Sequence, residues 1–258
     1  MKFILDWLAH PLTKGLELDD PATTNLRRQI IKSKPFLKGI YTEWYCALVK
    51  ASSAIDGPIL ELGAGAGFLS EVLPAVIRSD ILTTNHIDLV CDAMQLPFPG
   101  HIFRGILMTN VLHHLSEPEQ FFDEAARCVK TGGIIAMIEP WNTAWSKLVY
   151  TRIHHEPFDP TTNHWNLEPG KPLSNANGAI PWIIFSRDRA TFECIFPELK
   201  IEAIELMMPF SYLLSGGVSM RNLIPGWVYR PWRDIEKLLQ PIINSTGMFA
   251  LITLRKTN

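Results

Sequence analysis

The sequence has few charged residues and few cysteines, and it has no long apolar run. Only 19% of its 258 residues are charged and the formal net charge is −2, so the basic footprint of a nucleic-acid-binding protein is absent. No stretch reaches the roughly 18 apolar residues that a membrane-spanning helix needs. The four cysteines form no CxxC pair, which argues against a zinc site and against a disulfide framework.

The first ten residues, MKFILDWLAH, differ from a secretion signal, because Asp6 cuts an apolar run that is already too short. We therefore expect a cytoplasmic protein whose thiols are reduced. A chain of this length can bury a substantial core, as one large domain or two small ones.

What the sequence does contain is a glycine-rich stretch, ILELGAGAGFLSEVL, from Ile59 to Leu73. Ile59 to Leu62 is typical of a short buried strand, and a helix is predicted from about Phe68 to Leu73. Glycines between them allow positive φ angles and the close approach of a ligand, and a helix start directs unpaired N–H groups into the same space. The stretch indicates a site for a ligand that is negatively charged or rich in acceptors.

The spacing of these glycines separates two cofactor classes. A dinucleotide fingerprint needs its third glycine at position 68, where this sequence has Phe68. The observed order is an acid followed by glycines at alternate positions: Glu61, Gly63, Gly65 and Gly67. This order resembles the first motif of class I S-adenosylmethionine-dependent methyltransferases, and the resemblance extends over roughly Ile59 to Glu139.

The resemblance implies an α/β fold with a Rossmann-like, doubly wound, seven-stranded sheet, mostly parallel with an antiparallel last strand. Residues 1–54 would form a helical segment that acts as a lid of the same domain. Residues 55–258 would form the methyltransferase domain, which binds S-adenosyl-L-methionine, with insertions at about 140–186 and 209–241 that cap the site.

Two aspartates are expected to hold the nucleoside. The resemblance places Asp80, after a strand at 75–79, beside both ribose hydroxyls; if residues 81–84 are the strand instead, Asn85 takes that place. It places Asp92 and Ala93 at the adenine edge, although Asp92 alone would be an ordinary strand-end cap. Asn110 ends the fourth strand, where the acceptor and the sulfonium should meet.

The remaining pattern predicts further elements on both sides of this core. Arg27 and Arg28 should face outward on the first helix, and the aromatic residues at 41, 44 and 45 form either a lid or core packing. Residues 131–133 should form a turn, and residues 139–186 should be largely irregular. The expected helices are 22–32, 36–52, 118–130 and 187–196, and the later strands are 103–110, 134–138, 200–207 and 248–254.

Methyl transfer needs a base only when the acceptor loses a proton, and a histidine suits that task. His114, after the fourth strand, and His155, in the insertion, are the candidate catalytic residues, and packing or capping is the alternative for each. We expect no metal site, because His154 to Glu156 lack a third ligand at helical spacing.

The acceptor is expected to be a small or lipid-like molecule. No Asn/Asp-Pro-Pro-aromatic tetrad follows the fourth strand, which argues further against nucleic acid. The cap is rich in apolar residues, which would be core, acceptor pocket or a surface for peripheral membrane contact: Met207, Met208, Phe210, Leu213, Leu214, Trp227 and Trp232.

Three functions follow from these observations. The first is a methyltransferase acting at oxygen, with carbon or nitrogen as the other acceptor atoms. The second is a non-catalytic subunit that binds the cofactor without turnover. The third is a nicotinamide-dependent oxidoreductase, which binding of NAD and not of S-adenosylmethionine would select.

Overall fold

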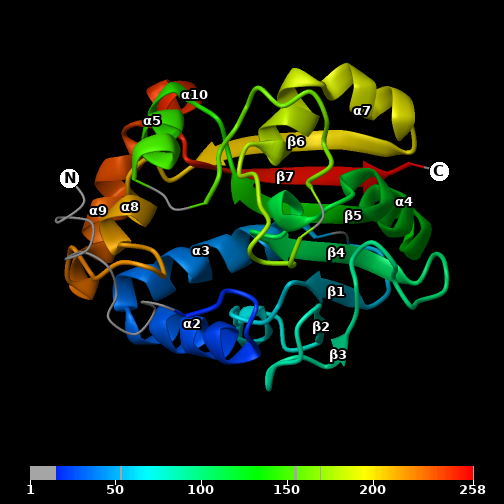
Figure 1. Ribbon diagram of the computed structural model, residues 1–258, viewed down its shortest axis with the longest axis horizontal. Coiled ribbons are helices and arrows are strands. Elements are labelled where there is room, and N and C mark those ends of the chain that lie inside the picture. The colour runs from blue at the N-terminus through cyan, green and yellow to red at the C-terminus, as the bar shows by residue number, and fades with distance from the viewer. Residues whose placement is uncertain (1–15, 53, 154–155, 169, 258) are drawn as a thin grey trace.

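The computed structural model describes residues 16–52, 54–153, 156–168 and 170–257 (Figure 1). Seven strands form one sheet in the order β3-β2-β1-β4-β5-β7-β6. β7 pairs antiparallel with both of its neighbours, and the pairs from β3 to β5 are parallel. The strands are β1 (Ile59–Leu62), β2 (Val76–Asp80), β3 (Leu89–Val90), β4 (Phe103–Thr109), β5 (Val129–Pro140), β6 (Leu199–Met207) and β7 (Phe249–Lys256). The predicted fold class is confirmed.

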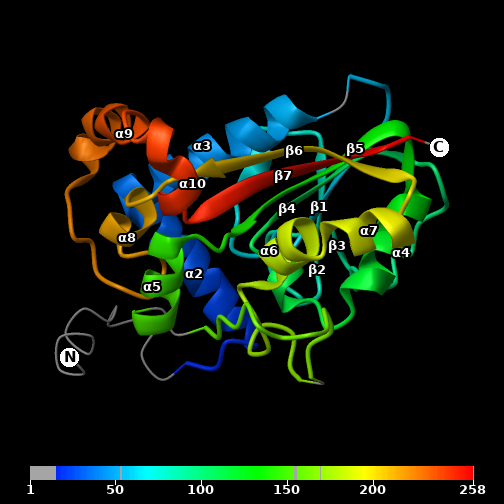
Figure 2. The same ribbon diagram turned by 90° about the horizontal axis from the view of Figure 1, so that it is seen from above.

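Helices cover both faces of the sheet (Figure 2). The larger ones are α2 (Pro21–Ser33), α3 (Pro35–Ala51), α4 (Pro118–Cys128), α5 (Ala144–Arg152), α7 (Arg189–Ile195) and α9 (Tyr229–Lys237). The short ones are η1 (Leu69–Glu71), η2 (Leu112–His114), α6 (Ile180–Trp182), η3 (Ile183–Arg187), α8 (Ser211–Ser215), η4 (Gly226–Val228), η5 (Gln240–Ile242) and α10 (Ile243–Thr246). None of the helices in these ranges is long and apolar enough to cross a membrane.

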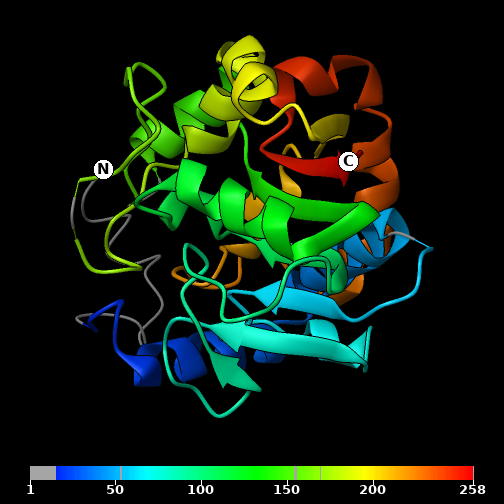
Figure 3. The ribbon, with the colours of Figure 1, turned by 90° about the vertical axis from the view of Figure 1, so that its right-hand side faces the viewer.

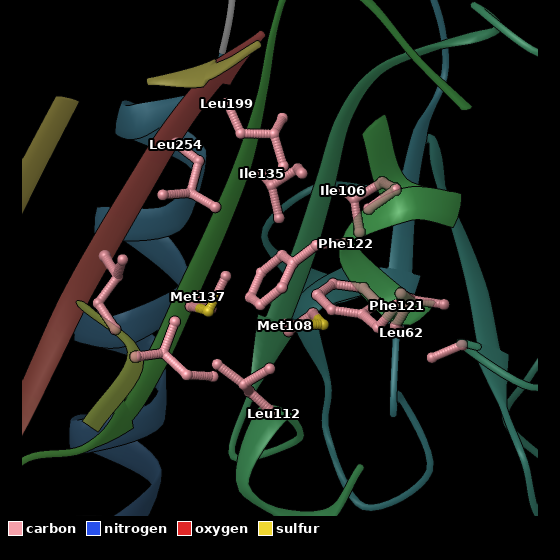
Figure 4. Close-up of a cluster of buried hydrophobic side chains, with 14 of the residues drawn as sticks. Leu62, Ile106, Met108, Leu112, Phe121, Phe122, Ile135, Met137, Leu199 and Leu254 are labelled. Carbon is pink, nitrogen blue, oxygen red and sulfur yellow. The ribbon is translucent and has the colours of Figure 1, made fainter. Parts of the chain in front are cut away.

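The alternation of side chains along the central strands creates a core on each face. Ile106 and Met108 of β4 pack with the phenylalanines of α4 on one face, while Leu107 packs with α3 on the other. Figure 4 shows the first cluster, in which Phe121 and Phe122 lie over β4 and β5. α4 faces the viewer in Figure 3. Because both faces are covered, the middle strands contain continuous apolar runs, such as residues 105–108 of β4 and 134–138 of β5.

The first two described helices follow the sequence pattern closely. The side chain of Asp20 accepts a hydrogen bond from Ala22 N at 2.8 Å and caps α2, with Pro21 at its first position. Trp44 and Tyr45 of α3 are fully buried against the sheet. The aromatic residues of α3 are therefore core residues in this structure, although Tyr41 and Tyr45 also reach a cavity.

The prediction of a helix directly after the glycines is wrong. A single 3₁₀ turn, η1, stands where residues 68–73 were predicted to be helical. Pro74 follows too soon for two helical turns to form, and Phe68 and Leu69 both turn into the core. The chain after the glycines therefore does not direct the unpaired N–H groups of an α-helix N-terminus toward a ligand, as the sequence had predicted.

Other differences concern boundaries and several helices that the sequence did not predict, among them α5 and α9. The turn predicted at residues 131–133 is an irregularity within the longer β5, where the pairing shifts between Phe103 and Gly105 of β4 and Gly132 has φ +80°. The segment expected to be irregular contains α5, which Thr143 caps by accepting from Ser146 N. Asp80 is the last residue of β2, so the alternative strand at 81–84 is wrong.

All four cysteines are free, as expected. Cys91 and Cys128 are buried, while Cys46 and Cys194 are exposed, so only half of them fit the expectation of buried thiols.

Candidate functional site

A cavity of about 880 Å³ lies against the ends of β1, β2 and β4. Its wall also includes residues of α2, α3 and α5, of the loop at 170–175, and of the cap at 212–220. This volume is near the upper end of the range for ligand pockets, about 300–1,000 Å³. Segments far apart in the sequence therefore meet around one space.

The glycine turn forms one wall of the cavity through two different uses of glycine. Gly63 has φ +73°, a conformation that other residues rarely adopt. Gly65 is needed for space, because a Cβ there would lie 2.7 Å from Thr24 Cγ2 and 2.8 Å from Asp80 Oδ2. The turn is held close to α2 and to the end of β2.

Glu61 lies beneath this turn and lines the cavity while being only 5% exposed. Burial raises the pKa of its carboxyl to about 8, against the opposing charges of Arg28 and Arg78. The group is therefore neutral near pH 7 in the ligand-free protein, and a cation bound beside it would draw out its proton.

Asp80 and Asp92 line the cavity at the ends of β2 and β3. Asp80 accepts from Gly65 N at 2.9 Å through Oδ2 and from Leu82 N at 2.8 Å through Oδ1. Burial raises its pKa, and these backbone hydrogen bonds oppose the shift. Asp92 accepts from Met94 N at 2.9 Å, which is the capping contact, and Ala93 beside it also lines the cavity. Each carboxylate keeps acceptor capacity for a ligand.

Asn110 stands where β4 meets the cavity, in a left-handed conformation with φ 56°. Burial raises the pKa of the Tyr41 hydroxyl to about 12, and the Asn110 side chain opposes this shift. Arg27 also lines the cavity and is only partly exposed, so the prediction that it faces outward is wrong. Asn85 is not among the lining residues.

Glu139, at the end of β5, organises the loop after β4. The Glu139 side chain is fully buried, and its Oε1 accepts from Val111 N and Leu112 N, each at 2.8 Å. Its Oε2 lies 2.6 Å from His113 Nδ1. Burial lowers the pKa of His113, but Glu139 and Glu156 outweigh it and raise the pKa to about 9. His113 is therefore a cation between two carboxylates.

His114, a predicted proton acceptor, lines the cavity beside His113, with ring centroids 4.2 Å apart. Its Nδ1 lies 3.2 Å from the carbonyl oxygen of Asn175, so Nδ1 is the nitrogen that carries the proton and Nε2 is an acceptor. Burial and the charge of His113 lower the His114 pKa to about 3. Such a group is a weak general base near pH 7. His155 lies outside the described residues.

The structure thus brings most of the predicted site residues to one cavity. Gly65, within the turn, donates its N–H to Asp80 and is not among the lining residues. Lining the cavity are Glu61, Gly63, Gly67, Asp80, Asp92, Ala93, Asn110 and His114. Sequence reasoning missed the roles of Glu139 and Glu156 beside His113. The only sequence signal was the position of Glu139 at the end of the fifth strand. Its contact with His113 could not be predicted, because the two residues stand 26 positions apart. The ligand-binding roles of all these residues remain predictions.

The fold and the cavity define an α/β protein with a ligand-sized cavity at the carboxyl ends of its parallel strands. Residues 60–137 match the family model of a methyltransferase domain. This match confirms, over this segment, the resemblance to class I methyltransferases that the glycine motif predicted. S-adenosylmethionine is the cofactor that the match indicates.

Solved structures resemble this chain in fold. A complex between the Haloferax volcanii Trm112 methyltransferase activator and a protein described as a methyltransferase matches with a TM-score of 0.50 and 13% identity, covering 90% of this chain and 98% of that chain. A geranyl diphosphate C-methyltransferase from Streptomyces coelicolor A3(2), in complex with Mg²⁺, geranyl diphosphate and S-adenosyl-L-homocysteine, matches at 11% identity, covering 83% and 77%, with a TM-score of 0.48.

A third similar structure is the cyclase SpnF, at 16% identity, covering 83% of this chain and 80% of that chain, with a TM-score of 0.46. A search of curated protein sequences finds no match to this chain. At these identities the structural likeness establishes the fold alone.

Proposed function

We propose that the protein transfers the methyl group of S-adenosylmethionine to an oxygen atom of a small or lipid-like acceptor. The observation that supports this most is the continuity of the cavity from the glycine turn and the aspartates to the histidine pair. A cavity of about 880 Å³ has room for an acceptor beside the cofactor. S-adenosylmethionine supplies an activated methyl group when bound.

The residues of the first half of the cavity fit such a cofactor. Gly63 and Gly67 of the turn line this half, and the buried Glu61 offers a partner for an ammonium group. Asp80 and Asp92 would hold the ribose and the adenine with their remaining acceptor capacity. Asn110 would lie between this half and the acceptor.

The second half fits an acceptor that is mainly apolar and carries a polar end. Tyr150, Leu213 and Phe249 line this space, and His114 offers an acceptor nitrogen for a hydroxyl. The main task of the protein in methyl transfer is to align the reactants and exclude water. A buried, largely apolar wall contributes to both the alignment of the reactants and the exclusion of water.

The proposal includes contact with a membrane surface, which is supported by an exposed apolar patch on and around α9. The patch residues are 51–80% exposed: Trp227, Ile235, Leu238 and Ile242. Side chains of this size in solvent are typical of a surface that meets lipid or another protein. Such a surface would bring a lipid-like acceptor close to the cap.

Isothermal titration with S-adenosylmethionine and S-adenosylhomocysteine tests the cofactor. We expect both to bind, and Asp80→Asn and Asp92→Asn to weaken binding by about tenfold or more, because each removes a charged acceptor. Asp88→Asn is the matched control. Asp88 directly precedes β3, pairs with Arg78 and does not line the cavity. No heat with either nucleoside, or equal affinity in all three variants, would refute the proposal.

A further inference from the structure

Three side chains that could bind a metal ion meet in the wall of the cavity. One ligand atom from each of His113, His114 and Glu156 lies within 4.8 Å of the other two. His113 Nε2 lies 3.8 Å from Glu156 Oε2. Two ligands at about 2.1 Å from a tetrahedral ion would stand roughly 3.4 Å apart, so a movement of about an ångström closes the set.

Both histidines are oriented as metal ligands usually are. Each has Nδ1 bonded to a fixed acceptor, which is the Glu139 carboxylate for His113 and the Asn175 carbonyl for His114. A ligating histidine almost always donates its other ring N–H to a carboxylate or a backbone carbonyl, which fixes the tautomer and the ring. Both Nε2 atoms are thus the ones that would bind an ion, which at His113 would displace the Nε2 proton.

The third ligand lies nearer to solvent than the groups that hold the histidines. The Glu156 side chain is 21% exposed, while those of His113 and Glu139 are 2% and 0% exposed. The shift that would close the ligand set therefore falls on this partly exposed carboxylate and not on the buried rings. The segment that carries Asn175, the partner of His114, is anchored to the same loop, because Asn177 N donates to His113 O at 3.0 Å.

We propose that His113, His114 and Glu156 bind one divalent transition-metal ion through two imidazole Nε2 atoms and one carboxylate oxygen. Two histidines and a glutamate are a zinc ligand set that leaves a fourth position open, and imidazole disfavours Mg²⁺ and Ca²⁺, which prefer oxygen. Because all three residues line the cavity, the open position would face it. It would take an oxygen atom of the acceptor, a role that rests on the proposed methyl transfer.

The test is a titration of the purified full chain with Zn²⁺ after dialysis against a chelator. We expect one ion per chain, no binding of Mg²⁺, and visible d–d absorption when Co²⁺ replaces Zn²⁺. His113→Ala, His114→Ala and Glu156→Gln should each weaken Zn²⁺ binding by about 100-fold or more. Glu156→Gln removes a partly exposed group, so it serves if a histidine variant fails to fold.

A positioning role of Glu139 gives a second readout. In Glu139→Gln the amide N–H would donate to His113 Nδ1 and force the ring proton onto Nε2, which then cannot bind an ion. Zn²⁺ affinity should fall about 10- to 100-fold, and the Co²⁺ spectrum should change, although no ligand has been removed.

Two control variants locate the site. His164→Ala removes a histidine whose Nδ1 also meets a backbone carbonyl but which stands outside the cluster, and Zn²⁺ binding should be unchanged. The pair His154→Ala, His155→Ala removes the histidines next to Glu156 in sequence, and binding should persist. Loss of the ion in either control, its retention in Glu156→Gln, or no binding by the unaltered chain would overturn the proposal.

Failure of the metal site and failure of the proposed function are separable. Zn²⁺ binding is measured without S-adenosylmethionine, and S-adenosylmethionine binding is measured in chelator. A chain that binds Zn²⁺ and not S-adenosylmethionine refutes the methyltransferase proposal and supports the metal site. The affinity for S-adenosylmethionine is expected to be equal with and without Zn²⁺, and a difference would contradict a place at the acceptor end.

Discussion

Cofactor binding should release a proton from Glu61. Burial raises the pKa of this carboxyl to about 8 in the free protein, so it is about 90% protonated at pH 7. An ammonium group placed beside it would lower this pKa, because the cation favours the ionised form. Binding at pH 7 should therefore release about 0.9 proton, and affinity should rise about tenfold per pH unit until pH approaches 8.

Isothermal titration calorimetry in buffers of different ionisation enthalpy measures the released proton directly. Glu61→Gln keeps the shape of the neutral carboxyl and removes its titration. This variant should therefore bind S-adenosylmethionine more weakly and should not release the Glu61 proton on binding. The ammonium group of the ligand also titrates, but it contributes equally to both proteins. The difference between them is the quantity that the prediction concerns.

Glu71→Gln is the matched control, because Glu71 forms an exposed ion pair with Lys32 at 2.6 Å and does not line the cavity. This variant should release the same number of protons as the unaltered protein. Equal proton release in Glu61→Gln and in the unaltered protein would refute the reasoning, because Glu61 would then be remote from the cation.

Three further predictions concern the turn, the cap and the exposed patch. Gly65→Ala should cost about 1–3 kcal/mol in the free energy of unfolding, measured by urea denaturation, and weaken S-adenosylmethionine binding, because its Cβ would collide with Thr24 and Asp80. Lys34→Met should cost about 2–3 kcal/mol, because the buried Lys34 ammonium donates to two carbonyl groups of the cap. Burial lowers the Lys34 pKa to about 8 from 10.5, so the unfolded chain binds more protons between these values, and the stability of the unaltered protein relative to this variant should rise with pH across that window. Trp227→Ser should reduce sedimentation with lipid vesicles by about tenfold, since Trp227 is 80% exposed.

Each of these changes has a control elsewhere in the chain. Gly105→Ala places its Cβ at ordinary contact distances of 3.6 Å or more and should be tolerated. Lys50→Met alters an exposed lysine and should leave stability unchanged. Val90→Thr alters an exposed apolar residue of β3, outside the α9 patch, and should not change vesicle binding. Controls that behave like the test variants would remove the structural reason for each effect.

The strands could be predicted because their short apolar runs, and the alternation along β6, are local patterns. The helix at residues 68–73 could not be excluded from apolar pattern alone, since Phe68 and Leu69 are apolar for a different reason, their burial beneath α3. α5 was missed because Leu148 is exposed while Val149 and Tyr150 are buried, which leaves no clear apolar stripe. Tertiary contacts thus determine the structure of both segments, residues 68–73 and α5.

The two halves of the cavity differed in how far the sequence could predict them. The cofactor half is encoded locally, since Glu61, Asp80 and Asp92 each stand at a strand end that the pattern marks. The acceptor half depends on contacts between distant segments: His113 meets Glu139 across 26 residues and Asn175 meets His114 across 61. No spacing rule connects such positions.

The two halves are nevertheless mechanically linked through adjacent strands. β4 lies between β1, which carries the glycine turn, and β5, which carries Glu139. Glu139 fixes the backbone of Val111 and Leu112 as well as the ring of His113, so the loop after β4 cannot move without breaking three buried contacts. A rigid spacing between the cofactor and the acceptor is what an in-line methyl transfer requires, because the reacting atoms must be aligned before reaction.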